Sequence, residues 1–177
     1  ASSYSTLTDA NDNNALTVTV SDDAGTNIAA TVLSAIGGKS SAAVTVSNAI
    51  EISGTTAAIN TALIGASSVV ASSALITGTG ADMTTAQLAT LDDLTSGIIT
   101  TTLATGAVAS FGAMTDDNGN NAITVNINGS GSIAATLLSA IGGKTSGVVT
   151  ATTVITITGS QAQLTAALVT DATKVIA

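Results

Sequence analysis

Two loops of the chain are rich in side-chain oxygens and have the composition of a calcium site. Ca²⁺ binds roughly six to eight oxygen ligands in flexible geometry, and clustered Asp and Asn side chains supply such oxygens. Neither loop carries the bidentate Glu that closes an EF-hand loop. The same residue types favour tight turns without any ion, and this second interpretation stays open. The candidate ligands are Asp9, Asn11, Asp12 and Asn14 in the first loop and Asp116, Asp117, Asn118 and Asn121 in the second.

Other residues that could do chemistry are few. The chain has no His and no Cys, which removes the usual general base, the thiol nucleophile and most transition-metal sites. Asp92 and Asp93 could be paired acids of a glycosidase, but adjacent residues of a helix point in different directions. Lys39 and Glu51 have the residue types of a self-forming isopeptide bond, but the second half of the chain has Thr156 in place of Glu51. We therefore expect no enzymatic activity and no cofactor other than calcium.

Charge and hydropathy argue against several classes of partner. Three lysines stand against eleven acids, a net charge of -8, so the chain lacks a basic surface for nucleic acid. With one Tyr and one Phe it has few rings on which a base or a sugar could stack, and the sequence gives a glycan partner no support. The mean hydropathy is +0.57, but glycines and hydroxyl residues interrupt the uncharged stretch 52–81, so we expect no membrane insertion.

An internal repeat organises the chain. Its three most similar pairs of segments are 7–20 with 114–127, 28–39 with 133–144, and 49–63 with 154–168. The best-matched pair reads IAATVLSAIGGK in the first copy and IAATLLSAIGGK in the second. We divide the chain into a first copy, a unique connecting unit and a second copy, at 1–72, 73–107 and 108–177.

Each copy predicts short strands that alternate with short helices. Aliphatic residues alternate with Thr or Ser at 16–20, 44–47 and 155–157, which predicts half-buried strands. Thr55 and Ser160 are expected N-caps of helices. Four sets of aliphatic residues have helical spacing, and each set is expected to lie on one face of its helix. The sets are Ile59 and Leu63; Leu164 and Leu168; Ile28, Val32 and Ile36; and Ile133, Leu137 and Ile141.

Three further features complete the predicted helices. A longer helix is expected at 82–94, with Leu88, Leu91 and Leu94 at helical spacing. Glycine pairs at 37–38 and 142–143 should end the helices of the best-matched segments. Lys39 and Lys144 follow these pairs, where a cation complements the C-terminus of a helix.

The predicted architecture is an α/β repeat, a solenoid-like stack of strand–strand–short helix units of about 26 residues. A unit of this size is too small to bury its own apolar face, so it must pack on its neighbours. Tandem β-sandwich modules are the alternative. Thr-rich strand faces also admit ice binding, but the exposed positions vary too much in residue type to favour it.

The motif I-x-I-(S/T)-G-(T/S)-x-x-A-x-(L/I)-x-x-A-L, at 50–63 and 155–168, resembles the Ala/Thr/Ser/Gly-rich repeat regions of giant bacterial surface proteins. These adhesin-like or matrix proteins are familiar from cyanobacteria and other marine bacteria. The resemblance implies an extracellular or cell-surface location, frequent calcium binding, and a role in fibres, surface coats or cell contacts. The calcium-binding nonapeptide of related repeats is absent from this sequence.

The sequence therefore predicts an extracellular structural repeat protein. The chain starts and stops within a repeat without a polar capping segment, so we expect apolar layers and strand edges to be exposed. Contact between two different surfaces propagates an open chain, and self-association head to tail would build a fibre, sheath or surface layer. A calcium-dependent adhesive segment of a giant cell-surface protein is the alternative.

Overall fold

The computed structural model describes residues 4, 6–8, 14–65, 69–116, 119, 121–153, 155–173 and 175–177. The chain forms two compact units, unit 1 from residues 1–80 and 90–99 and unit 2 from residues 81–89 and 100–177. Both are mixed α/β structures in which short helices accompany mostly parallel strands. Among the strands that the structure describes, none closes into a barrel.

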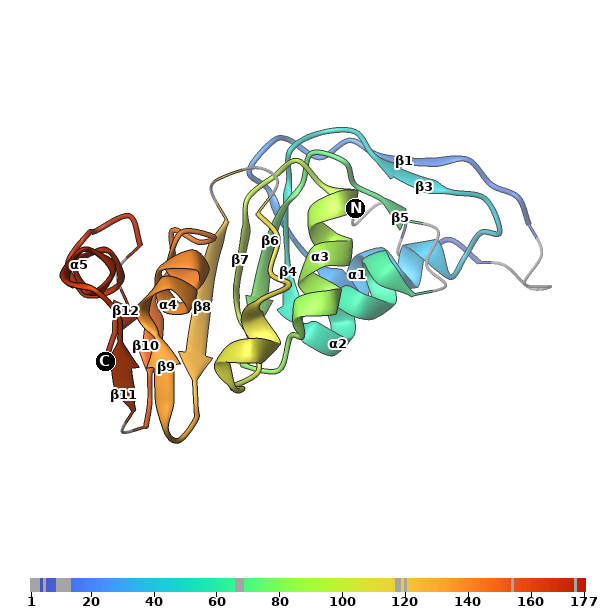
Figure 1. The fold of residues 1–177 in the computed structure, drawn as a ribbon. Helices are drawn as coiled ribbons and strands as arrows, with labels where there is room; N and C mark the ends of the chain where they lie inside the picture. Colours follow the sequence, from blue (N-terminus) through green and yellow to red (C-terminus); the bar gives the residue numbers. More distant parts are fainter. Residues whose placement is uncertain are drawn as a thin grey trace. The chain divides into compact units, whose positions relative to one another are not determined.

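Unit 1 contains two ladders of parallel strands (Figure 1). The first ladder has the order β1-β3-β5 and the second the order β2-β4-β6. In the second ladder Ile28 pairs with Ile52 and Ile52 with Ile76, and all three side chains are buried. A branched aliphatic side chain at the same place in each strand gives the ladder a continuous apolar inner face. The strands are β1 (Val18–Val20), β2 (Asn27–Ala29), β3 (Val44–Val46), β4 (Glu51–Thr55), β5 (Val69–Val70) and β6 (Leu75–Thr79).

A short helix directly follows β2 and another follows β4. The helix after β4 continues into a π-helical segment, η2, and this segment packs against α1. Thr55 is the predicted N-cap, and its side chain accepts a hydrogen bond from the Ala58 amide at 3.2 Å. The division between the two units falls within α3. The bounds are α1 (Ala30–Gly37), α2 (Thr56–Ile59), η2 (Asn60–Ile64) and α3 (Thr85–Leu94).

Unit 2 repeats this arrangement with a longer first ladder. Its ladders have the orders β7-β8-β10-β12 and β9-β11. Helices α4 and α5 follow β9 and β11 and pack against each other (Figure 1). The predicted N-cap Ser160 forms a capping box with Gln163. The elements are β7 (Ile99–Thr102), the 3₁₀ helix η3 (Val108–Phe111), β8 (Ala122–Ile127), β9 (Ser132–Ala134), α4 (Ala135–Gly142), β10 (Val149–Ala151), β11 (Thr156–Thr158), α5 (Gln161–Leu168) and β12 (Val175–Ile176).

The direction of the strands excludes one of the two predicted fold classes. A β-sandwich is built from antiparallel sheets. The pairs β1–β3, β2–β4, β8–β10 and β9–β11 are all parallel, so the tandem β-sandwich alternative is wrong. The predicted alternation is confirmed in β1 and β3, where buried valines lie on either side of the exposed Thr19 and Thr45. It does not extend to Leu16, which lies before β1 and is 36% exposed.

The predicted buried face of the first helix is wrong. We expected Ile28, Val32 and Ile36 on one helical stripe, but Ile28 lies in β2 and Val32 is 40% exposed. The helix instead buries Ala30, Leu33 and Ile36. The physical reason is the pairing of β2 with β4, which holds residues 27–29 extended and makes the helix start later than the apolar spacing suggests.

The second copy and the connecting unit need the same kind of correction. Ile133 lies in β9, Leu137 is exposed, and Leu138 is the buried leucine of α4. In α3, Leu94 is 43% exposed, although it was expected on the apolar face. Helices α1 and α4 do end at the predicted glycines. A Cβ at Gly142 would lie 2.2 Å from the Thr173 carbonyl oxygen, so only glycine fits there.

Candidate calcium site and the pocket around Asp116

The structure describes part of the predicted calcium site. Asp116, Asn121 and Asn14 are described, and they come from the loops that precede β8 and β1. The predicted ligands Asp9, Asn11, Asp12, Asp117 and Asn118 lie outside the described residues. Of the predicted ligands in the second copy, the structure therefore gives hydrogen bonds for Asp116 and Asn121.

The Asp116 side chain closes its own loop. Its Oδ1 accepts a hydrogen bond from the Asn121 amide at 3.2 Å. Its backbone carbonyl accepts from the Gly119 amide at 3.1 Å, and Gly119 has a φ of 70°, which favours glycine. The side chain and the backbone carbonyl of Asp116 therefore both accept hydrogen bonds from amides that follow it in the chain.

Asn121 and its counterpart Asn14 connect the loop to the following module through their backbone carbonyls. The Asn121 carbonyl accepts from the Ser146 amide at 2.9 Å. The Asn14 carbonyl accepts from the Ser41 amide at 2.9 Å. Both copies therefore use this asparagine in the same structural way.

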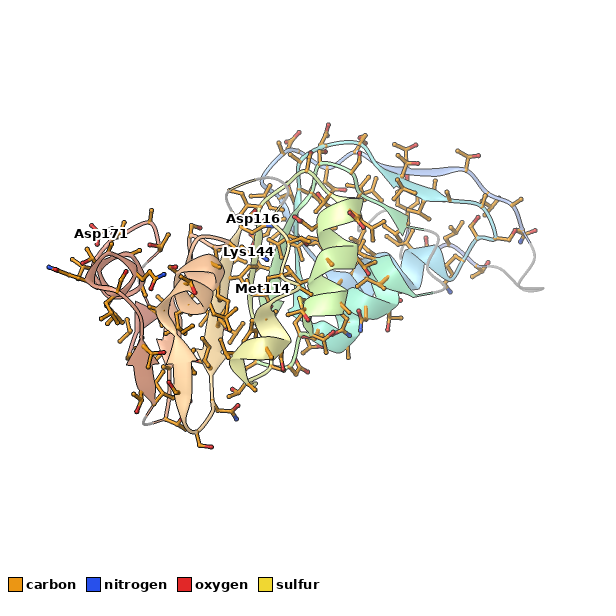
Figure 2. The ribbon with its side chains drawn as sticks, viewed as in Figure 1. Met114, Asp116, Lys144 and Asp171 are labelled. Carbon is orange, nitrogen blue, oxygen red and sulfur yellow. The ribbon has the colours of Figure 1, made fainter. Side chains whose placement is uncertain are left out.

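Asp116 lines a polar pocket of about 500 Å³. Figure 2 labels Asp116 and Asp171, which both belong to its lining. Asp116 and Asp171 supply its two carboxylates, and Gly142 and Gly143, at the end of α4, form part of its wall. Asp171 was not among the predicted ligands, because no other acidic residue is near it in the sequence after α5. Within the described part of the chain, no three acidic, His or Cys side chains group as metal ligands. Calcium at this position stays a prediction that requires further oxygens besides these two carboxylates.

Lys144 lies close to this pocket and binds carbonyl groups of the segment before β8 (Figure 2). Its Nζ donates to the Gly112 carbonyl at 3.0 Å and to the Met114 carbonyl at 2.8 Å. We had expected the ammonium group to complement the end of its own helix. It instead holds the turn that follows η3, whose Phe111 side chain is buried.

A group of hydroxyl residues, missed in the sequence, joins each module to the one before it. The Thr145 hydroxyl accepts from the Ile123 amide at 2.7 Å and donates to the Ile123 carbonyl at 2.8 Å. Ser40 makes the same pair of bonds with Leu16, at 2.9 and 2.7 Å. Thr95 donates to the Ala74 carbonyl at 2.6 Å. The shared signal is a Ser or Thr, then Ser, then Gly or Ala, shortly before a strand: Ser40-Ser41-Ala42, Thr95-Ser96-Gly97 and Thr145-Ser146-Gly147.

The other residues considered for chemistry lie in different surroundings. Asp92 is buried in α3, while its neighbour Asp93 is exposed. The Glu51 carboxylate accepts a hydrogen bond from Thr77 of the adjacent strand at 2.8 Å. Lys39 lines an apolar groove of about 620 Å³ on α1, which we call the α1 groove; its wall includes Tyr4, Ile28, Val32 and Ile36.

Two findings concern the chain as a whole. In the ranges that the structure describes, no helix combines the length and the apolarity needed to cross a membrane. Comparison of the chain with protein-family models, with curated proteins and with solved structures gives no match. The function must therefore be inferred from the repeat and from these sites.

Proposed function

We propose that this chain is an extracellular structural repeat protein, without enzymatic activity, that self-assembles head to tail into a fibre, sheath or surface layer. The observation that carries the proposal is that a strand of the first repeat copy pairs on both of its edges, while its counterpart in the second repeat copy pairs on one edge. Strand β4 of the first copy pairs with β2 on one side and β6 on the other. Its counterpart β11 pairs with β9, and no strand within the described residues pairs with its other edge.

Equivalent aliphatic side chains report the same difference. The first copy buries Ile52, Ile59 and Leu63, whereas the second copy leaves Ile157, Leu164 and Leu168 half-buried. A strand edge with free backbone donors and acceptors, next to half-covered aliphatic side chains, is a template for another strand. A second molecule of this chain carries the same kind of short parallel strands that pair with each other within one chain, and this supports self-assembly.

We also propose that each unit is a solenoid-like stack of strand–strand–helix modules. In unit 1, Val18 pairs with Val44 and Ile52 pairs with Ile76, so equivalent residues recur after 26 and 24 positions. Parallel pairing with a nearly constant interval is what a stack of equal modules produces. In such a stack each module contacts only its neighbours, and the two ends expose the faces that the interior covers.

The cell-surface location in this proposal rests on the resemblance of the motif at 50–63 and 155–168 to the repeat regions of giant bacterial surface proteins. The partner that the proposal requires is another copy of the chain. The net charge of -8 supports a chain that does not bind nucleic acid.

A second candidate function is a calcium-dependent adhesive segment of a giant cell-surface protein. The observation that favours it is the pocket that Asp116 and Asp171 both line, together with Gly142 and Gly143 at the end of α4. Two carboxylates next to the carbonyl end of a helix attract a cation. On this proposal calcium binding would control adhesion or assembly.

Light scattering after size-exclusion chromatography and negative-stain electron microscopy test both candidates. The protein should be compared from micromolar to millimolar concentration, with calcium and with a chelator. We expect concentration-dependent filaments in the chelator as well. Assembly only with calcium, lost in Asp116→Asn but kept in the exposed-acid control Asp93→Asn, would favour the second candidate. A monomer at every concentration, with or without calcium, would contradict the first.

A further inference from the structure

The α1 groove lies over helix α1 of unit 1 and is open among the residues that the structure describes. Its floor is apolar, formed in part by Ile28, Ile36 and the 40% exposed Val32, and Lys39 supplies a cation at its wall. Tyr4 lines the groove, but its hydroxyl donates to the Thr19 carbonyl at 2.8 Å and its side chain stays half-exposed. With the described residues in place, a groove of about 620 Å³ remains.

Unit 2 shows what covers the equivalent surface of α4. Here Leu137 and Lys144 take the places of Val32 and Lys39, and Phe111 takes the place of Tyr4. The 3₁₀ helix η3 packs against α4, and its last residue, Phe111, is only 2% exposed. Lys144 binds the carbonyl groups of Gly112 and Met114, which follow that helix. This surface therefore accepts a helical turn that ends in a large apolar side chain, and its lysine binds the carbonyls beyond the turn.

A second helical turn of this kind is exposed elsewhere on the chain. Helix α5 ends at Leu168, and the next residue, Val169, is 66% exposed, more than any other large apolar side chain among the described residues. Asp171 lies two residues further along and is also exposed. The end of α5 thus combines an apolar side chain, the partial negative charge of a helix C-terminus and a carboxylate.

We propose that the α1 groove of one molecule binds the C-terminal turn of α5 from a second molecule of the same chain. Val169 enters the apolar groove beside Val32, and the carboxylate of Asp171 and the end of α5 face the Lys39 ammonium group. The two surfaces are complementary in hydrophobicity, because Val169 meets the apolar groove, and in charge, because the negative end of α5 meets Lys39. Because the two surfaces differ, the contact is head to tail and leaves a free groove and a free α5 turn at its ends. The inference rests on the proposed self-assembly and names the surfaces that make it.

A disulfide-trapping experiment tests the contact directly, since the natural chain contains no cysteine. Val32→Cys and Val169→Cys are made as separate variants, mixed and mildly oxidised. Mixing single-cysteine chains restricts the trapped product to different molecules, and peptide mass spectrometry identifies the 32–169 link. The matched control is Leu137→Cys mixed with Val169→Cys, because Leu137 is the repeat counterpart of Val32 and is 38% exposed. We expect the 32–169 link in clear excess over the 137–169 link.

Charge exchange gives an independent readout. Lys39→Asp alone and Asp171→Lys alone should each raise the concentration of half-assembly by about threefold to fivefold, the scale of an exposed ion pair. An equimolar mixture of the two variants should recover part of this loss. In the mixture, every contact between unlike variants again joins one positive and one negative side chain. Unchanged thermal unfolding of both variants would show that their folds are intact.

The outcomes separate the inference from the proposed function. Equal trapping of the 32–169 and 137–169 links, in a protein that still assembles, would overturn the inference and leave the proposed function standing. A wild-type chain that stays monomeric in light scattering, together with a mixture of the Val32→Cys and Val169→Cys variants that gives no 32–169 link, would overturn both. Clear preference for the 32–169 link, with partial recovery in the mixed charge variants, would support both.

Discussion

The β4–α2 module of the first copy and the β11–α5 module of the second copy share one sequence motif but differ in burial. Ile52 and Ile59 are fully buried, while their counterparts Ile157 and Leu164 are half-buried. Strand β6 lies along β4, whereas β11 has no second neighbour among the described strands. The difference shows that cover comes from the next module and not from the motif itself. The proposed stack of modules would behave in this way, because its stability would be a sum over nearest neighbours.

Truncation of equivalent isoleucines compares the two modules directly and should include the largest single loss of stability. Ile52→Ala removes a fully buried side chain and should lower the free energy of unfolding by about 3 kcal/mol. Ile157→Ala removes a half-covered side chain and should lower it by about 1 kcal/mol. Urea denaturation followed by circular dichroism measures both variants. Equal losses would mean that the two modules are covered to the same degree in solution.

A glycine next to the covering strand offers a way to loosen the cover. A Cβ at Gly97 would lie 2.1 Å from the Ala74 carbonyl oxygen, just before β6 begins. We expect Gly97→Ala to displace this segment and to cost about 2 to 3 kcal/mol in urea denaturation. The control is Gly129→Ala, where a Cβ would have no neighbour within 4 Å and we expect a change below about 0.5 kcal/mol. Similar results for both glycines would contradict the close approach.

Two buried threonines should respond with opposite signs. The Thr95 hydroxyl donates to the Ala74 carbonyl at 2.6 Å and accepts from the Gly97 amide at 3.0 Å, so Thr95→Val should destabilise the fold by about 2 kcal/mol. Thr101 is 4% exposed, and its hydroxyl has no hydrogen-bond partner. Thr101→Val should therefore stabilise the fold by about 1 kcal/mol. Thermal unfolding by calorimetry measures both, and a destabilised Thr101→Val would show that this hydroxyl is bonded in solution.

The equivalent lysines should give the smallest difference. Lys144→Met leaves the carbonyl groups of Gly112 and Met114 without their donor and should cost about 1 to 1.5 kcal/mol. Lys39→Met enlarges the apolar surface of the open α1 groove and should change the stability of the monomer by less than about 0.5 kcal/mol. Measurement at low protein concentration keeps assembly out of the comparison. Equal effects would mean that Lys39 already clamps a turn as Lys144 does.

Much of the local structure was predictable from the sequence, because it depends on neighbours along the chain. The Val–Thr alternation of β1, the N-caps Thr55 and Ser160, and the glycines that end α1 and α4 are local features. The buried face of α1 was not predictable in this way. The pairing of β2 with β4 decides where that helix starts, and this pairing joins residues 24 positions apart.

The candidate site shows the same division. Asp116 and Asn121 were recognised as a polar loop, and the structure joins them by a hydrogen bond. Asp171 in the same pocket and the two carbonyls held by Lys144 were not foreseen, because their contacts arise between modules. The hydroxyl pattern of Ser40, Thr95 and Thr145 was present in the sequence, but small polar residues are so frequent in this chain that it did not stand out.

Hydrogen exchange as a function of protein concentration tests the central claim most directly. The claim is that a second molecule of the chain covers the β11–α5 module, which is open in a single molecule. In a dilute sample, amides of β11 and α5 should exchange faster than their counterparts in β4, α2 and η2. At concentrations where filaments form, β11 and α5 should gain protection while β4 stays unchanged. Protection of β11 and α5 that does not change with concentration would contradict the claim.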